Sequence, residues 1–115
     1  MSLRNKSRNN LIAEIILTLD RQFHQTLQML NHNGTPDNCV LWINPCNGIY
    51  TAGMKKPVDI AFLDKYGRIV RILKDFPPDC FADSAPTAIS AIELPNGRLS
   101  ETETRLGDLM EITVD

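Results

Sequence analysis

The chain has 115 residues, 43% of them apolar, which is the size of a single domain that can bury a core without disulfides or metals. Its 12 basic and 14 acidic residues are interspersed along the sequence. This balance provides no field strong enough to hold a phosphate backbone or an anionic membrane surface. We therefore expect neither nucleic acid nor a membrane as a partner.

The N-terminal segment is polar, and we expect a disordered segment over residues 1–10 and a single β-rich domain over residues 11–115. Basic residues followed by LIAEIILTL superficially imitate a signal peptide. Glu14 interrupts the apolar run, however, and Asp20 and Arg21 follow where cleavage would need small residues. No stretch approaches the ~20 apolar residues that span a bilayer. We therefore expect a cytoplasmic protein.

An amphipathic helix is predicted from the region of Leu11 to about Leu30. Apolar residues recur there at spacings of three and four, which places them on one helical stripe: Ile16, Leu19, Phe23, Leu27 and Leu30. The polar segment 31–34 and then Pro36 would end the helix. A stripe of this kind usually faces a core. The pattern also allows a short strand around Leu11 to Glu14, before the helix.

The sequence after Asp37 has the pattern of β-strands. Short apolar runs are separated by Gly, Pro and Asn, and they read CVLWI, IYTAGM, VDIAFLD, RIVRILK, TAISAIEL and DLMEITV. The first of these runs is apolar throughout, as in a strand that is buried on both faces. The sequence thus predicts a mainly β domain with one helix.

A β-hairpin is the clearest of these predictions. VDIAFLD and RIVRILK flank the turn residues DKYG, and we expect the hairpin to close over Lys65 and Tyr66 with Leu63 opposite Arg68. Both faces of this hairpin are mainly apolar, which is typical of a sheet that is covered on two sides. Further along the chain, Ser100 and Glu103 are spaced as a capping box for a short helix that ends at Leu106, before Gly107.

Two carboxylates, Asp59 and Glu93, fall on apolar strand faces. Burial of a carboxylate costs several kcal/mol unless it is paired or hydrogen-bonded. One interpretation is a general acid and base pair, in which the distance between the two groups decides the chemistry. The commoner interpretation is structural: Asp59 accepts backbone N–H groups after Pro57, and Glu93 is satisfied by Arg71 or Lys56.

The three cysteines show no paired spacing. Cys39, Cys46 and Cys80 form no CxxC motif, and only His24 and His32 could add nitrogen ligands, so we expect no structural zinc and no other metal. The thiols are expected to be free. GxSxG elbows and glycine-rich phosphate loops are absent from the sequence. We accordingly assign no catalytic residues and no cofactor.

The chain resembles the bacterial and archaeal family called domain of unknown function 192. The resemblance rests on IYTAGM, on Pro57 and Asp59 three and five residues after Met54, and on FLD with an IVRI-like strand. It continues in Pro77-Pro78, IELPNG and a terminal Gly107-Asp108. Family members commonly carry an aromatic residue where this chain has Ala52. The resemblance implies a mainly β (α+β) fold, a single compact small β-barrel or jelly-roll-like sandwich with one N-terminal helix packed against it. It implies no catalytic residues.

Three functions remain open from the sequence. The first is a non-enzymatic binding or accessory module with a shallow pocket for a small polar ligand or a protein segment near the IYTAGM loop. Its candidate ligand-binding residues are Tyr50, Thr51, Gly53, Met54, Lys55, Asp59 and Glu93. The second is an enzyme that uses Asp59 and Glu93 as acid and base. The third is a structural partner in a larger assembly, bound through the helix or an exposed strand edge.

Overall fold

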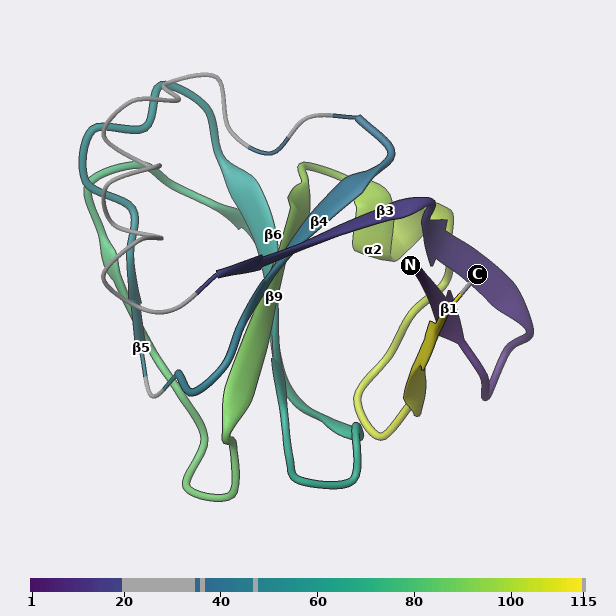
Figure 1. The fold of residues 1–115 in the computed structure, drawn as a ribbon. Helices are drawn as coiled ribbons and strands as arrows, with labels where there is room; N and C mark the ends of the chain where they lie inside the picture. Colours follow the sequence, from purple (N-terminus) through teal and green to yellow (C-terminus); the bar gives the residue numbers. More distant parts are fainter. Residues whose placement is uncertain (20–34, 36, 47, 115) are drawn as a thin grey trace.

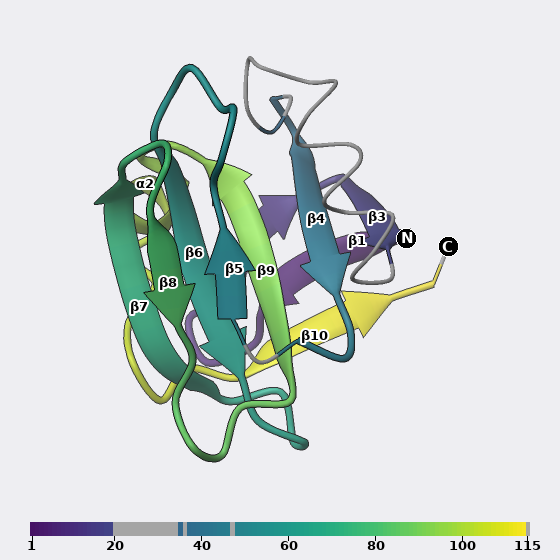
Figure 2. The same ribbon diagram turned by 90° about the vertical axis from the view of Figure 1, so that its left-hand side faces the viewer.

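The computed structural model describes residues 1–19, 35, 37–46 and 48–114. These residues form three β layers, with a five-stranded sheet in the middle (Figures 1 and 2). A three-stranded sheet covers one face of the middle sheet, and a two-stranded ribbon covers the other. The two layers of core between them hold the molecule together.

The middle sheet has the strand order β3-β4-β9-β6-β7. β3 runs parallel to β4, and the other neighbours are antiparallel. The bounds are β3 Ile15–Leu19, β4 Cys39–Ile43, β9 Ser90–Pro95, β6 Val58–Leu63 and β7 Ile69–Phe76. All six residues of β6 are buried, so the prediction of a sheet covered on two sides is confirmed.

The three-stranded sheet brings the two ends of the chain together. It consists of β1 Ser2–Asn5 between β10 Met110–Thr113 and β2 Asn10–Ala13. Its apolar side chains, with those of the middle sheet, form the first core: Leu3, Ile12, Ala13, Ile16, Val40, Ala61, Leu63, Ile69, Ile92, Leu94, Leu99 and Met110.

The ribbon pairs β5 Gly48–Tyr50 with β8 Phe81–Asp83 and lies in front of β6 and β9 in Figure 2. It covers the second core, which consists of Ile43, Cys46, Ile49, Met54, Val58, Ile60, Phe62, Ala82 and Ala91. Side chains alternate between the two faces of a strand. Neighbouring residues of β6 therefore belong to different cores.

The predicted N-terminal helix is wrong in the part of the chain that the structure describes. Residues 10–13 and 15–19 form β2 and β3, while the predicted part from residue 20 to Leu30 lies outside the described residues. IILTL is apolar apart from Thr18, and a short run of this kind fits a strand as well as a helix. Pairing of β3 with β4 over five residues decides for the strand. The short strand predicted around Leu11 to Glu14, before the helix, corresponds to β2.

Strands occur within residues 1–10, for which we expected a disordered segment. β1 is hydrogen-bonded on both sides, to β2 and to β10. Asn5 is fully buried, and its amide nitrogen donates to Thr104 Oγ1 and Asp108 Oδ2. These partners lie about a hundred residues away along the chain, so the local polarity of the segment could not reveal them.

The predicted barrel or jelly-roll-like sandwich is a further error, although the strand-rich character was right. In the described residues the middle sheet is open, with β3 and β7 as its two edges, and the remaining strands form separate sheets. No helix in these residues exceeds the four residues of α2, Arg98–Glu101. None is therefore long enough to cross a membrane.

The short helix α2 differs from its prediction. Gly97 is its N-cap and Ser100 lies inside it, so Ser100 and Glu103 do not form a capping box. Glu103 instead lies beyond the helix with a φ of 56°. The N–H of Leu99, in the first turn, donates to the carboxylate of Asp59 on β6. A side chain from a strand thus accepts a backbone N–H at the start of the helix, where we had expected a local cap.

The hairpin between β6 and β7 closes one residue later than predicted. Leu63 lies opposite Ile69 rather than Arg68, and the register shifts between Phe62 and Leu63. Gly67 has a φ of +87°, and a Cβ there would lie 2.9 Å from the backbone oxygen of Met110. Glycine is needed at this turn both for its conformation and for the close approach of β10.

Substitution of Gly67 tests this contact. We expect Gly67→Ala to lower the free energy of unfolding by about 2 kcal/mol or more, because it adds a clash with backbone to the cost of a positive φ. Gly53→Ala is the matched control: its φ is +80°, but nothing lies within 4 Å of the added Cβ. Urea denaturation should show the larger loss for Gly67→Ala. Equal losses of stability in the two variants would mean that the close approach of β10 does not restrict the side chain at position 67.

Candidate functional site

Asp59, one of the candidate ligand-binding residues, is a buried structural carboxylate. It is 1% exposed. Its Oδ1 accepts the N–H of Asp75 and its Oδ2 accepts the N–H of Leu99, both at 3.0 Å. Asp75 has a φ of 54°, and its own carboxylate accepts the amide of Asn96. Asp59 therefore joins β6 to β7 and to the start of α2.

Glu93, the other predicted carboxylate, lies on the opposite face of the same sheet. Glu93 pairs with Ile60, whose side chain belongs to the second core, whereas Asp59 pairs with Leu94 in the first core. Directly paired residues point to the same face, and successive residues point to opposite faces. Glu93 is 1% exposed and has a partner of its own. The sheet thus separates the two carboxylates.

The IYTAGM loop is tied down by Thr51. The hydroxyl of Thr51 lies 2.8 Å from the carbonyl oxygen of Pro77 and accepts the N–H of Cys80. The N–H of Gly53 donates to the carboxylate of Asp79, and Met54 is buried in the second core. These bonds attach the loop to the segment that follows β7.

Tyr50, within this loop, and Lys55, directly after it, are the remaining predicted residues, and both are exposed. A shallow groove of about 240 Å³ lies near the start of β6, but its lining includes none of the seven predicted residues; it consists of Thr35, Asp37, Lys56, Pro57, Val58, Pro95 and Asn96. This groove thus does not join the predicted residues into one site.

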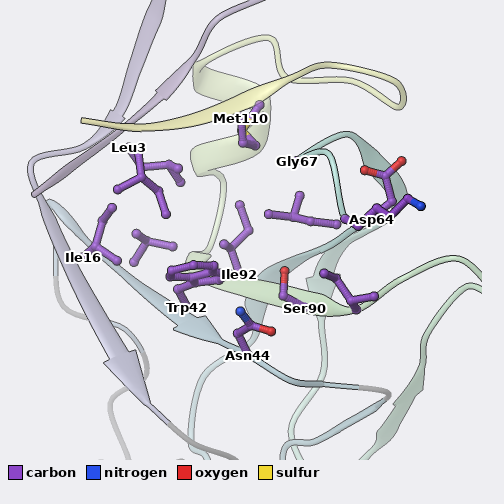
Figure 3. A pocket seen from close by; sticks show the side chains of 14 residues that line it. Leu3, Ile16, Trp42, Asn44, Asp64, Gly67, Ser90, Ile92 and Met110 are labelled. Carbon is purple, nitrogen blue, oxygen red and sulfur yellow. The ribbon is translucent and has the colours of Figure 1, made fainter. Parts of the chain in front are cut away.

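A pocket of about 260 Å³ lies instead on the first-core side of the middle sheet, against the three-stranded sheet. We call it the intersheet pocket. It is lined by Leu3, Ile16, Val40, Trp42, Asn44, Leu63, Asp64, Lys65, Gly67, Ile89, Ser90, Ile92, Met110 and Ile112. Figure 3 shows Leu3 and Ile16 at one side and Asp64 at the other, with Trp42, Ile92 and Ser90 between them.

The polar groups of the intersheet pocket come from the ends of strands. Asn44 follows β4, Ser90 begins β9, and Asp64 and Lys65 belong to the turn between β6 and β7. Asp64 holds that turn, since its Oδ1 accepts the N–H groups of Tyr66 and Arg68. The pocket therefore has apolar walls and a polar rim, a composition that suits a small molecule with one polar end.

Trp42 is a pocket residue that was not among those predicted from the sequence. It is the single tryptophan of the chain, within the apolar run CVLWI. Its indole nitrogen is buried and has no hydrogen-bond partner in the part of the chain that the structure describes. A buried tryptophan usually finds an acceptor for this N–H group. A tryptophan in an apolar strand was the signal that could have drawn attention to this face.

A third buried carboxylate, Asp108, fastens the ends of the chain. Its Oδ2 accepts hydrogen bonds from Asn5 Nδ2, Arg8 Nε and the N–H of Arg105, at 2.8 to 2.9 Å. Burial alone raises the pKa of this carboxyl, but the hydrogen bonds and the charge of Arg8 outweigh it, so the pKa lies below its ordinary value. The Gly107-Asp108 motif thus has a structural role.

Together these observations define a small three-layer β domain with an apolar cavity between two of its layers. The model of the domain of unknown function 192 family, described as "Uncharacterized ACR", matches residues 5–112, so the chain belongs to this family. The resemblance stated from the sequence is confirmed. No protein of curated function matches the chain.

Two solved structures share the fold. One is a protein of unknown function from Novosphingobium aromaticivorans DSM 12444, with a TM-score of 0.72 and 16% identity over 84% of this chain and 74% of that one. The other, from Sinorhizobium meliloti 1021, bears the name "putative transcription regulator"; its TM-score is 0.72 and its identity 15%, over 84% of this chain and 79% of that one. At such identities the likeness concerns the fold alone.

Asp59→Asn tests the structural role of Asp59. An amide can replace only one of the two acceptor oxygens, and its NH₂ group would face a backbone N–H. We expect a loss of ~1–3 kcal/mol in the free energy of unfolding, measured with urea. The control is Asp83→Asn, at an exposed position on β8, which should change stability little. An Asp59→Asn protein as stable as the wild type would contradict the structural role.

Asp108 generates a prediction about pH. Because its folded-state pKa is lowered, its carboxylate contributes stability that is complete above the ordinary value of 3.8 and is lost as the pH falls through the folded-state pKa. Asp108→Asn should therefore destabilise the protein at neutral pH and weaken its loss of stability in acid. Urea midpoints over a series of pH values check this, with exposed Asp37→Asn as the control. An unchanged acid profile in Asp108→Asn would contradict the assignment.

Proposed function

We propose that this protein is a non-enzymatic binding module and that the intersheet pocket is its ligand site. The observation that carries the proposal is the pocket itself, about 260 Å³ in volume with apolar walls and a few polar groups at its rim. Pockets of this composition are the usual places where proteins bind small molecules. We therefore propose this pocket as the ligand site in place of the predicted IYTAGM loop, whose polar groups are engaged in holding the loop.

The size of the pocket favours a compact ligand. An apolar cavity of ~150 Å³ in a protein core holds a benzene molecule, so this larger pocket suits a molecule with a ring and a short substituent. Such a ligand would bury its apolar part against Leu3, Ile16 and Ile92 and leave a polar end toward Asn44 and Ser90. Removal of apolar surface from water would supply most of the affinity.

A binding role is preferred to the enzyme alternative because of where the carboxylates lie. Asp59 and Glu93 project to opposite faces of one sheet and cannot act on one substrate as an acid and base pair. Asp64, which is the one carboxylate among the described residues that line the intersheet pocket, already accepts two backbone N–H groups. These placements suit recognition rather than proton transfer.

A thermal-shift screen with small amphipathic compounds tests the proposal. A ligand at 100 times its dissociation constant adds about 2.7 kcal/mol to the free energy of unfolding, which should raise the melting temperature of a domain of this size by about 10 °C. We expect hits that combine one ring with one polar group.

A pair of variants locates any hit. Ile89 is 45% exposed at the rim of the intersheet pocket, and Ile89→Trp should obstruct entry and abolish the shift at little cost in stability. Leu106→Trp, at a position that is 64% exposed and outside the pocket, should leave the shift intact. A screen without hits, or hits that survive Ile89→Trp, would contradict the proposed function.

A further inference from the structure

We propose that the ligand of the intersheet pocket carries a hydrogen-bond acceptor and that Trp42 recognises this acceptor through its indole N–H. The inference rests on the proposed function and narrows the ligand to one chemical class: small molecules with an apolar ring or chain and a carbonyl, ether or carboxylate oxygen. It assigns a specificity role to Trp42.

The first observation is the state of the indole nitrogen. Nε1 of Trp42 is buried from solvent, and no acceptor lies within hydrogen-bond distance in the described part of the chain. Within the described part of the chain, this donor is therefore left without a protein acceptor. An unsatisfied buried donor forfeits the free energy of the hydrogen bond that it makes in water, and a ligand that supplies an acceptor restores it.

The second observation is the position of the ring. Trp42 lies on β4 opposite Ile92 of β9 and belongs to the wall of the intersheet pocket. Since its N–H is covered by surrounding atoms, an acceptor reaches it only when side chains at the pocket wall shift. The neighbouring free volume of about 260 Å³ gives them room to do so.

The other polar groups of the pocket differ in kind from Trp42. Asn44 is exposed at the rim, and Asp64 is engaged in its turn. The Ser90 hydroxyl and the Asn44 amide can each donate or accept, whereas an indole N–H only donates. A site that depends on Trp42 therefore distinguishes acceptors from donors, which a hydroxyl would not do.

Two probes of the same shape test the inference. Acetophenone and ethylbenzene differ by one carbonyl in place of one CH₂ group. Their dissociation constants for the wild type and for Trp42→Phe are measured by NMR titration of backbone amide signals. The preference of the wild type for acetophenone over ethylbenzene should exceed that of Trp42→Phe by about tenfold. The ratio of the two dissociation constants is compared between the two proteins, so the different hydration of the two probes cancels.

A matched variant separates Trp42 from its polar neighbour. Ser90→Ala removes the other buried polar side chain of the pocket, and it should keep more of the preference for acetophenone than Trp42→Phe does. Should Ser90→Ala lose the preference while Trp42→Phe keeps it, the acceptor is bound by Ser90 and the inference is overturned.

The wild type alone provides a second readout, which holds even if Trp42→Phe does not fold. The single tryptophan gives one indole N–H signal. Saturation with acetophenone should move this proton downfield relative to saturation with ethylbenzene. If both probes bind and the two signals coincide, the inference fails while the proposed function stands. If neither probe binds the wild type, the inference is overturned, and the thermal-shift screen decides separately on the proposed function.

Discussion

The structure depends on one strand, β6, that is buried along its whole length. Every residue of it is covered, and it is hydrogen-bonded to β7 on one side and to β9 on the other. Such a strand needs a layer over each face, and the ends of the chain and the β5–β8 ribbon provide these layers. Burial of apolar surface on both faces is the main contribution to stability.

Asp59 is the polar exception that this arrangement has to accommodate. A buried carboxylate is tolerated when its oxygens receive hydrogen bonds, and here the N–H groups of Asp75 and Leu99 supply them. Both donors belong to irregular backbone, at a positive φ and at a helix start. The Asp59 carboxylate therefore satisfies two backbone N–H groups that would otherwise lack an acceptor. It is not available for a ligand.

The sequence predicted those parts of the fold that local patterns encode. CVLWI corresponds to β4, and VDIAFL corresponds to the doubly covered β6. Family membership was also predicted. The errors concern the N-terminal residues, where a mostly apolar run is compatible with two periods. They also concern contacts such as Asn5 with Asp108, which join the ends of the chain and leave no local signal.

The candidate site was predictable only in part for a related reason. The sequence indicated which carboxylates lie on apolar faces, but the face of each depends on a register set by β9. The intersheet pocket is formed by residues from six strands and their connecting segments, and none of these segments has an unusual pattern alone. Trp42 was visible in the sequence, yet its unsatisfied N–H could be recognised only after the layers were assembled.

Crystallography under xenon pressure tests most directly whether this protein encloses an apolar site. Xenon occupies apolar cavities that are wide enough to admit it and makes no demand on hydrogen bonding. We predict xenon in the intersheet pocket, in contact with Trp42, Ile92 and Met110. A pocket that stays free of xenon, or one whose walls have closed together in the crystal, would contradict the account.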